Sequence, residues 1–203
     1  MKESLIVKHL GKSFNQVSIF SNISFNLSPG SVVSLEGING SGKTTLMKII
    51  GSQILDYSGE VLLGNKNIKD YGSDLFSNIY YLSPFPNLYE YLTLNENISF
   101  FSNLNDIQNI QSTNSLISSF NLDKYALNKV HELSDGTKKK ISILISFLVS
   151  PDFFLLDEPY TYLDSHSIKI LNNLIEQSSK KGKSFLIADN SSGILNFTGS
   201  VGL

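Results

Sequence analysis

The chain has 203 residues, 41% of them hydrophobic, which is enough for one domain with a full core. Its net charge of −2 excludes a global basic field for nucleic acid, and the absence of cysteine excludes disulfides and thiolate metal sites. All 16 basic residues are lysine, so the chain cannot supply an arginine finger to its own site. No apolar run reaches the length of a membrane span, and the first five residues lack the hydrophobic region of a secretory signal, so we expect a cytosolic domain.

The first third of the chain predicts strands around a glycine-rich loop. Residues 5–7 and 19–27 are expected to be strands, the second because apolar and polar residues alternate along it. Residues 31–35 predict a short buried strand, and residues 45–50 predict the first turns of a helix. A further strand is expected at 59–64, where glycines bound a short apolar run.

The rest of the chain predicts strands that alternate with helices. The expected strands are 79–82, 152–156 and 184–188, and the expected helices lie within 93–120 and at 134–149 and 165–180. Such alternation predicts a parallel sheet with right-handed crossovers. The first 30 residues and residues 59–70 are expected to form a separate antiparallel sheet. Residues 193–197 are expected to supply one closing strand.

The glycine-rich loop carries the strongest chemical signal. Residues 37–45 read G-I-N-G-S-G-K-T-T, which matches the pattern G-x-x-x-x-G-K-[ST]. Glycines let the backbone curl so that several N–H groups point at one anion, Lys43 can reach the β- and γ-phosphates, and the Thr44 hydroxyl can ligate Mg²⁺. The expected helix after the loop turns its positive N-terminus toward the phosphates. The sequence therefore predicts that the chain binds a nucleoside triphosphate.

A second signal is a pair of carboxylates, Asp157 and Glu158, which follow the apolar residues 153–156. Asp157 is expected at the carboxyl end of a parallel strand, where ligands of α/β sheets bind, and can hold the Mg²⁺ of a nucleotide. Glu158 can polarise a water that attacks the γ-phosphate. The alternative is a strand followed by an acidic helix start that the helix dipole stabilises.

Between these two motifs lies the sequence L-S-D-G-T at residues 133–137. Ser134 is a good helix N-cap, and Gly136 leaves backbone N–H groups open in the first turn, which predicts a second anion-binding helix N-terminus. With the phosphate loop and the Asp-Glu strand, this segment resembles the ATP-binding subunits of ABC transporters. The three motifs stand in the order and spacing of that family.

The resemblance covers residues from about 4 to 190 and implies an α/β fold of the P-loop NTPase type. In such a fold a parallel-sheet core carries a small antiparallel β subdomain and an α-helical subdomain. We expect a single domain over residues 1–203, with the helical subdomain at about 84–150. ATP and Mg²⁺ are the implied cofactors.

The resemblance also implies roles for particular residues. The residues expected to wrap the phosphates are Asn39, Gly40, Ser41, Gly42, Lys43, Thr44 and Thr45. Thr44 and Asp157 would hold Mg²⁺, and Glu158 would act as the general base. Phe14 stands where the family places an aromatic ring that stacks on adenine; the alternative is a core phenylalanine.

Two such domains close head to tail in the family, so a second ATP-binding subunit is an expected partner. Ser134 and Gly136 would bind the γ-phosphate of the ATP held by that second subunit. Residues 162–164 match the loop that crosses the dimer interface. The stretch 86–97 resembles exporter-type members, in which this region docks against a separate integral membrane subunit; the alternative is an aromatic-rich loop that covers the core.

The chain departs from the family pattern at three places. Pro84 stands where a glutamine normally contacts Mg²⁺ and the attacking water, and proline offers no side-chain ligand. Asn190 stands where the family places a histidine, so it can donate a hydrogen bond to the γ-phosphate but cannot carry a charge. Asp135 brings a carboxylate into the L-S-D-G-T segment, where we expect it to face solvent at the helix start.

The leading hypothesis is therefore an ATPase subunit that powers a membrane exporter from the cytoplasmic face of the membrane. The alternative is a degenerate, slowly hydrolysing subunit that regulates a heterodimeric transporter, because Pro84 and Asn190 replace two groups that act on the γ-phosphate. A third reading is an ABC ATPase that acts on DNA or ribosomes. It is disfavoured because the chain has no coiled-coil insertion, no second ATPase domain and no basic surface, and no nucleic-acid partner is expected.

Overall fold

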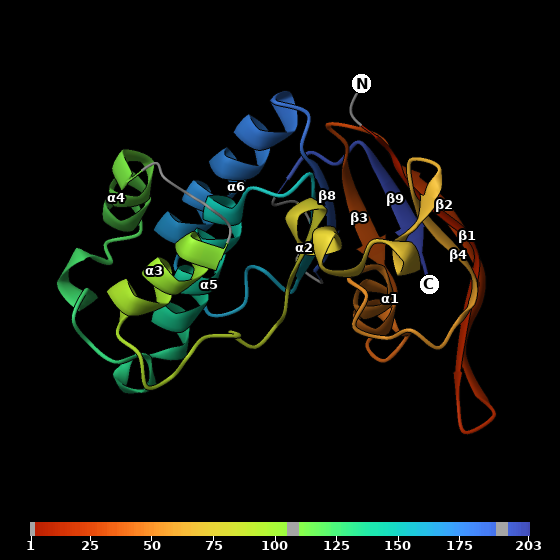
Figure 1. The fold of residues 1–203 in the computed structure, drawn as a ribbon, viewed down its shortest axis with the longest axis horizontal. Helices are drawn as coiled ribbons and strands as arrows, with labels where there is room; N and C mark the ends of the chain where they lie inside the picture. Colours follow the sequence, from red (N-terminus) through yellow and green to blue (C-terminus); the bar gives the residue numbers. More distant parts are fainter. Residues whose placement is uncertain (1–2, 105–109, 190–194) are drawn as a thin grey trace.

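The computed structural model of the chain describes residues 3–104, 110–189 and 195–203, which form two β-sheets with helices packed against them (Figure 1). The larger sheet is parallel, with strand order β6-β7-β8-β3-β9. Its strands are β3 (Val32–Glu36), β6 (Ile79–Leu82), β7 (Phe153–Asp157), β8 (Ser184–Ala188) and β9 (Gly199–Gly202). The predicted parallel core is confirmed.

The smaller sheet is antiparallel and has the strand order β2-β1-β4-β5. Its strands are β1 (Leu5–Phe14), β2 (Val17–Leu27), β4 (Ser58–Leu63) and β5 (Lys66–Asn67). Strand β1 is longer than the predicted residues 5–7 because β2 pairs with it on one side and β4 on the other, so its polar residues also join the ladder.

The helices lie in two groups on either side of the parallel sheet (Figure 1). They are α1 (Lys43–Ile50), α2 (Leu75–Asn78), α3 (Leu94–Leu104), α4 (Ile110–Ser119), α5 (Asp135–Val149) and α6 (Ser165–Lys180), with 3₁₀ turns at Ile68–Asp70, Gly72–Asp74, Asp123–Tyr125 and Val130–Glu132. Helix α1 packs between the two sheets, whereas α5 and α6 cover the opposite face of the parallel sheet. Within the part of the chain that the structure describes, no helix is long and apolar enough to cross a bilayer.

Two hydrophobic cores meet at the parallel sheet because successive side chains of a strand point to opposite faces. Leu155 and Leu186 pack toward α1 and the antiparallel sheet. Phe154 and Phe185 pack toward α5 and α6, and their ring centroids lie 4.6 Å apart in a stacked arrangement. Strand β7 is buried along its whole length, as its apolar run predicts.

The predicted position of the closing strand, residues 193–197, is wrong. Residues 193 and 194 lie outside the described residues, residues 195–197 are not in a strand, and the strand at this edge is β9. Thr198 donates its backbone N–H to the Val32 carbonyl at 2.7 Å, and from there the chain runs parallel to β3. The small residues of β9 give no apolar alternation, so backbone pairing with β3 decides where the strand forms.

Candidate functional site

The glycine-rich loop connects β3 to the start of α1 at the carboxyl end of the parallel sheet. Gly42 is the N-cap of α1 and has φ of 103°, in the left-handed region that favours glycine. A Cβ atom here would lie 2.6 Å from Ile19 Cγ2 and 2.9 Å from Phe20 Cδ1 of strand β2. The requirement for glycine therefore comes from the backbone conformation and from the close approach of the antiparallel sheet.

Lys43, the first residue of α1, extends over the loop that precedes it. Its Nζ atom donates to the Gly37 carbonyl at 2.6 Å and to the Ile38 carbonyl at 3.2 Å. The ammonium group is thus held at the mouth of the loop. This is the position from which a lysine can reach the outer phosphates of a bound nucleotide.

A cavity of about 310 Å³ joins the loop to the two carboxylates at the end of β7. Its lining residues are Ile19, Asn39, Gly40, Gly42, Lys43, Thr44, Thr45, Asp157 and Glu158. The structure therefore brings together two motifs that lie more than a hundred residues apart in the chain. Ser41 does not line the cavity, and its hydroxyl is buried instead beside Gly37.

Asp157 is the last residue of β7 and is 2% exposed. The hydroxyl of Tyr81, on the neighbouring strand β6, donates to Asp157 Oδ2 at 3.0 Å. Burial raises the pKa of Tyr81, and the charge of Asp157 and the hydrogen bond to it act in the same direction. Tyr81 thus remains a donor that orients the carboxylate. Sequence reasoning missed Tyr81 because only the pairing of β6 with β7 brings it to Asp157.

Glu158 follows Asp157 with a φ of 46°, which is uncommon for a residue with a side chain. Its backbone N–H donates to the Ala188 carbonyl at 2.8 Å, so strand β8 fixes this conformation. The turn directs the chain away from the sheet immediately after the two carboxylates. Both side chains consequently lie at the cavity instead of on opposite faces of a continued strand.

The donor set at the cavity suits Mg²⁺ bound together with a phosphate. Thr44 offers a hydroxyl and Asp157 a carboxylate, and Mg²⁺ is usually held by one or two protein oxygens with waters and substrate phosphates completing its shell. Among the residues that the structure describes, no three His, Cys, Asp or Glu side chains gather into a metal-binding group. A metal ion here would therefore take most of its ligands from phosphates and water.

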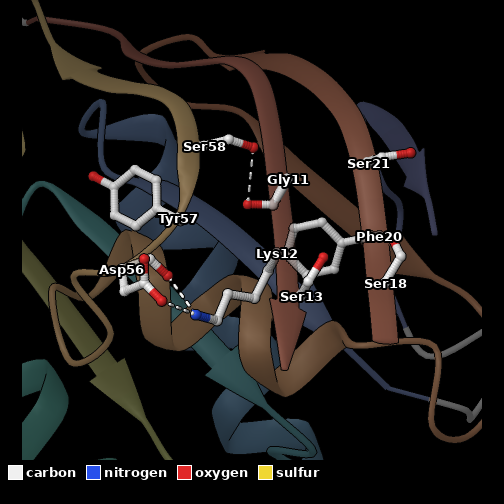
Figure 2. A pocket seen from close by; sticks show the side chains of 9 residues that line it. All are labelled: Gly11, Lys12, Ser13, Ser18, Phe20, Ser21, Asp56, Tyr57 and Ser58. Atoms are coloured by element: carbon white, nitrogen blue, oxygen red, sulfur yellow. Dashed lines mark hydrogen bonds and ion pairs between the residues drawn. The ribbon is translucent and has the colours of Figure 1, made fainter. Parts of the chain in front are cut away.

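Phe14 lies at the end of β1 and is 46% exposed, so the alternative of a core phenylalanine is excluded. The Nζ atom of Lys12 lies 4.6 Å from the Phe14 ring centroid. The same ammonium donates to the Asp56 backbone carbonyl at 2.6 Å and pairs with Asp56 Oδ2 at 2.9 Å, as Figure 2 shows. Lys12, Asp56 and Ser58 also line a second cavity, of about 310 Å³, beside the β1–β2 hairpin.

Ser134 and Gly136 lie at the start of α5, outside the cavity that holds Lys43. Ser134 caps the helix as predicted, since its hydroxyl accepts from the Thr137 backbone N–H at 3.3 Å. A Cβ on Gly136 would lie 2.7 Å from the Tyr162 carbonyl, so the two segments approach closely. Asp135 is exposed, in agreement with its expected solvent-facing position. Asn190 lies outside the described residues.

Comparisons with known proteins identify the family of this chain. The family model described as "ABC transporter" matches residues 20–161, more than half of the chain, and this chain belongs to that family. The ATP-binding subunits of the family generally bind ATP with Mg²⁺ and hydrolyse it, usually pair with a second such subunit, and work with a membrane transporter component.

Known relatives lie in the same family. The cytochrome c biogenesis ATP-binding export protein CcmA of Reclinomonas americana is 34% identical over 167 residues, 81% of this chain and 74% of that protein. An uncharacterised ABC transporter ATP-binding protein of Methanocaldococcus jannaschii is 28% identical over 191 residues, 93% of this chain and 68% of that protein. A solved structure of an ABC transporter ATP-binding subunit has a TM-score of 0.85 and 26% identity, over 91% of this chain and 78% of that one.

Proposed function

We propose that this chain binds and hydrolyses ATP at the cavity between the glycine-rich loop and β7, and that the cycle powers an exporter. The observation that carries the proposal is that Lys43, Thr44, Asp157 and Glu158 line one and the same cavity. A cation for the phosphates, a hydroxyl and a carboxylate for the metal, and a second carboxylate for the attacking water are the parts that phosphoryl transfer requires.

In this proposal each residue has one task. Lys43 and the loop amides bind the β- and γ-phosphates, with Asn39, Gly40, Ser41, Gly42 and Thr45 forming the loop around them. Thr44 and Asp157 hold Mg²⁺, which would neutralise charge that develops on the phosphate oxygens. Glu158 accepts the proton of the water that attacks the γ-phosphate. The exposed ring of Phe14 stacks on the base.

We also propose that two subunits close around two nucleotides. Ser134 and Gly136 lie outside the cavity of their own chain, where they are free to contact a nucleotide held by another subunit. Residues 84–150 act as a helical subdomain within one domain, 1–203. Asn190, in place of the family's histidine, donates a hydrogen bond to the γ-phosphate.

The membrane partner is proposed to dock on the exposed aromatic side chains that follow β6. Phe85 is 76% exposed, Tyr91 80% and Tyr89 50%, which is unusual for large apolar rings on one short segment. Export is favoured because several relatives are named as ATP-binding export proteins. This arrangement would place the subunit at the cytoplasmic face of the membrane.

A degenerate, slowly hydrolysing subunit of a heterodimeric transporter is the second candidate. It is favoured by Pro84, which offers no side-chain ligand at the end of β6. The intact pair of Asp157 and Glu158 at the cavity favours active hydrolysis. Steady-state turnover, first of the chain alone and then with its membrane partner, separates the two candidates.

Two substitutions test the proposed site. Lys43→Ala should abolish ATP binding, because it removes the cation at the mouth of the loop. Glu158→Gln should keep ATP binding, lower hydrolysis by roughly 10²–10⁴-fold, and accumulate an ATP-bound dimer. Binding by calorimetry, phosphate release and size-exclusion chromatography measure the three effects. A purified chain that binds no ATP in the presence of Mg²⁺ would contradict the proposal.

A further inference from the structure

Lys139 is a buried lysine for which the proposed cycle has no task. It lies in the first half of α5 and is 0% exposed, whereas the flanking Lys138 and Lys140 reach the surface and pair with Glu90 and Asp164. A buried ammonium is costly unless it is paired or hydrogen-bonded. The position therefore requires a physical explanation.

The Nζ atom of Lys139 donates to two successive backbone carbonyls, those of Ser83 at 3.2 Å and Pro84 at 3.3 Å. These residues begin the stretch that leads from the end of β6 to the start of α3, which we name the 83–93 segment. Pro84 has no side-chain polar group, so its carbonyl is the acceptor that it can offer. Lys139 thus holds the start of the segment by backbone atoms.

Lys139 also interacts electrostatically with the two carboxylates at the end of β7. Burial lowers the pKa of Lys139 to about 8, while the charges of Asp157, Glu158 and Asp189 oppose that change. On β6, Tyr81 is bonded to Asp157 only two residues before Ser83. The lysine is therefore within electrostatic range of the two carboxylates and contacts the chain two residues beyond Tyr81, yet it does not line the cavity that would hold the nucleotide.

The far end of the 83–93 segment is fastened separately. Tyr89 donates its N–H to the side chain of buried Asn97 at 2.9 Å, and Asn97 donates back to the Tyr89 carbonyl at 3.0 Å. His131 donates its backbone N–H to the Glu90 carbonyl at 3.0 Å. These bonds tie the far end to the helices, whereas Lys139 ties the near end to α5.

We propose that Lys139 is a positioning residue that fixes the start of the 83–93 segment beside Asp157 and Glu158, so that hydrolysis of ATP, but not its binding, depends on it. The inference rests on the proposed function, because it concerns the same site. In this chain the lysine compensates for Pro84, whose side chain has no polar group: Lys139 of α5 holds the backbone at this position instead. The segment that Lys139 holds also carries the exposed aromatic rings of Phe85, Tyr89 and Tyr91.

The test uses the full chain with Phe85→Trp as background, since the natural sequence contains no tryptophan. Lys139→Met removes the ammonium and keeps an apolar stem, Lys139→Arg keeps a charged donor, and Lys169→Met on the exposed side of α6 is the matched control. ATP affinity is measured by calorimetry, kcat by phosphate release, and the state of the segment by tryptophan emission with and without ATP and Mg²⁺.

For Lys139→Met we expect ATP affinity within about twofold of the background, kcat lower by about tenfold, and loss of the ATP-dependent emission change. Lys139→Arg should restore both kcat and the emission change, and Lys169→Met should match the background. If Lys139→Met does not fold, Lys139→Gln replaces it and should also lower kcat, because its shorter side chain cannot reach both carbonyls.

A folded Lys139→Met or Lys139→Gln chain with background kcat and background emission change would overturn the inference while leaving the proposed function intact. Absence of ATP binding in the background chain would instead contradict the proposed function. If the background chain binds ATP without measurable turnover, the emission change is the deciding measurement. Its loss in Lys139→Met supports the inference, and its persistence overturns it.

Discussion

The ammonium of Lys12 lies between the ring of Phe14 and the carboxylate of Asp56, with its side chain only 4% exposed. Its hydrogen bond and charge lower the pKa of Asp56, whose own side chain is almost fully solvated. The contact with Asp56 anchors the end of the β1–β2 hairpin to the stretch that follows α1. Phe14 is thereby held at a fixed place relative to the helix that starts the phosphate site.

Replacing Lys12 with methionine tests this anchoring. We expect the affinity for ATP to fall by about 2- to 5-fold, since a cation–π contact contributes ~0.5–1 kcal/mol at such sites. Affinity for tripolyphosphate should stay unchanged, because Lys12 does not line the cavity around Lys43. Calorimetric titration with both ligands measures the difference.

Lys66→Met is the control for this prediction, since Lys66 lies 4.3 Å from the ring centroid of Tyr71 in the same sheet but away from Phe14. It should leave both affinities unchanged. An equal loss of ATP and tripolyphosphate binding in Lys12→Met would show that the lysine acts through the phosphate site instead of through the base.

Individual site residues could be predicted from the sequence where they belong to a motif with a characteristic spacing. The loop around Lys43 and the pair Asp157–Glu158 follow from local patterns, and the structure brings them to one cavity. Tyr81 and Lys139 could not be found in this way. Three consecutive lysines look alike in a sequence, and only the turn of about 100° per residue on a packed helix decides which one is buried.

At the scale of single elements, the start of α6 depends on Asp164. Its carboxylate accepts from the Ser167 backbone N–H at 2.8 Å and pairs with Lys140 of α5, so it caps one helix and contacts another. The bond to Lys140 and the backbone bond from Ser167 lower the pKa of Asp164 well below its usual range. The side chain is 54% exposed, so solvent screens much of this effect.

Asp164→Ala should lower the free energy of unfolding by about 1 kcal/mol at neutral pH, mainly through loss of the cap. Asp164→Asn keeps a capping oxygen and should lose less. Because the folded pKa is depressed, the contribution of this carboxylate is complete above its unfolded pKa near ~4 and fades as the pH falls below it. The difference between parent and Asp164→Ala should therefore shrink in acid; a constant difference from pH 7 to 2 in urea unfolding would refute the assignment.

Elements were predictable where the apolar pattern was strong. The runs at β3, β7 and β8 and the helical pattern of α6 appear where the sequence placed them. Strand β9 was misplaced because Gly199, Ser200 and Gly202 carry no apolar alternation, and its backbone pairing with β3 is a tertiary effect. The length of β1 escaped prediction for the same reason.

At the scale of the whole molecule, both hydrophobic cores pack against the parallel sheet, one on each face. Phe154→Ala should destabilise the chain by about 3–5 kcal/mol, because it removes a 1% exposed ring from the stack with Phe185. Leu127→Ala, at an 83% exposed position, should change stability by no more than ~0.5 kcal/mol. Thermal and urea unfolding measure both, and similar effects at the two positions would contradict a core layered on the two faces of the sheet.

The close approach of Gly42 to Ile19 and Phe20 means that the start of α1 is packed against the antiparallel sheet. A ligand in the adjoining cavity would touch Ile19 of that sheet as well as Asp157 of the other, and so would hold two separately built sheets together. Its binding free energy would then add to that of the fold, by about 2.7 kcal/mol at a concentration one hundred times Kd. The stability of this chain against unfolding would in that case rise with the concentration of the ligand that fills the cavity.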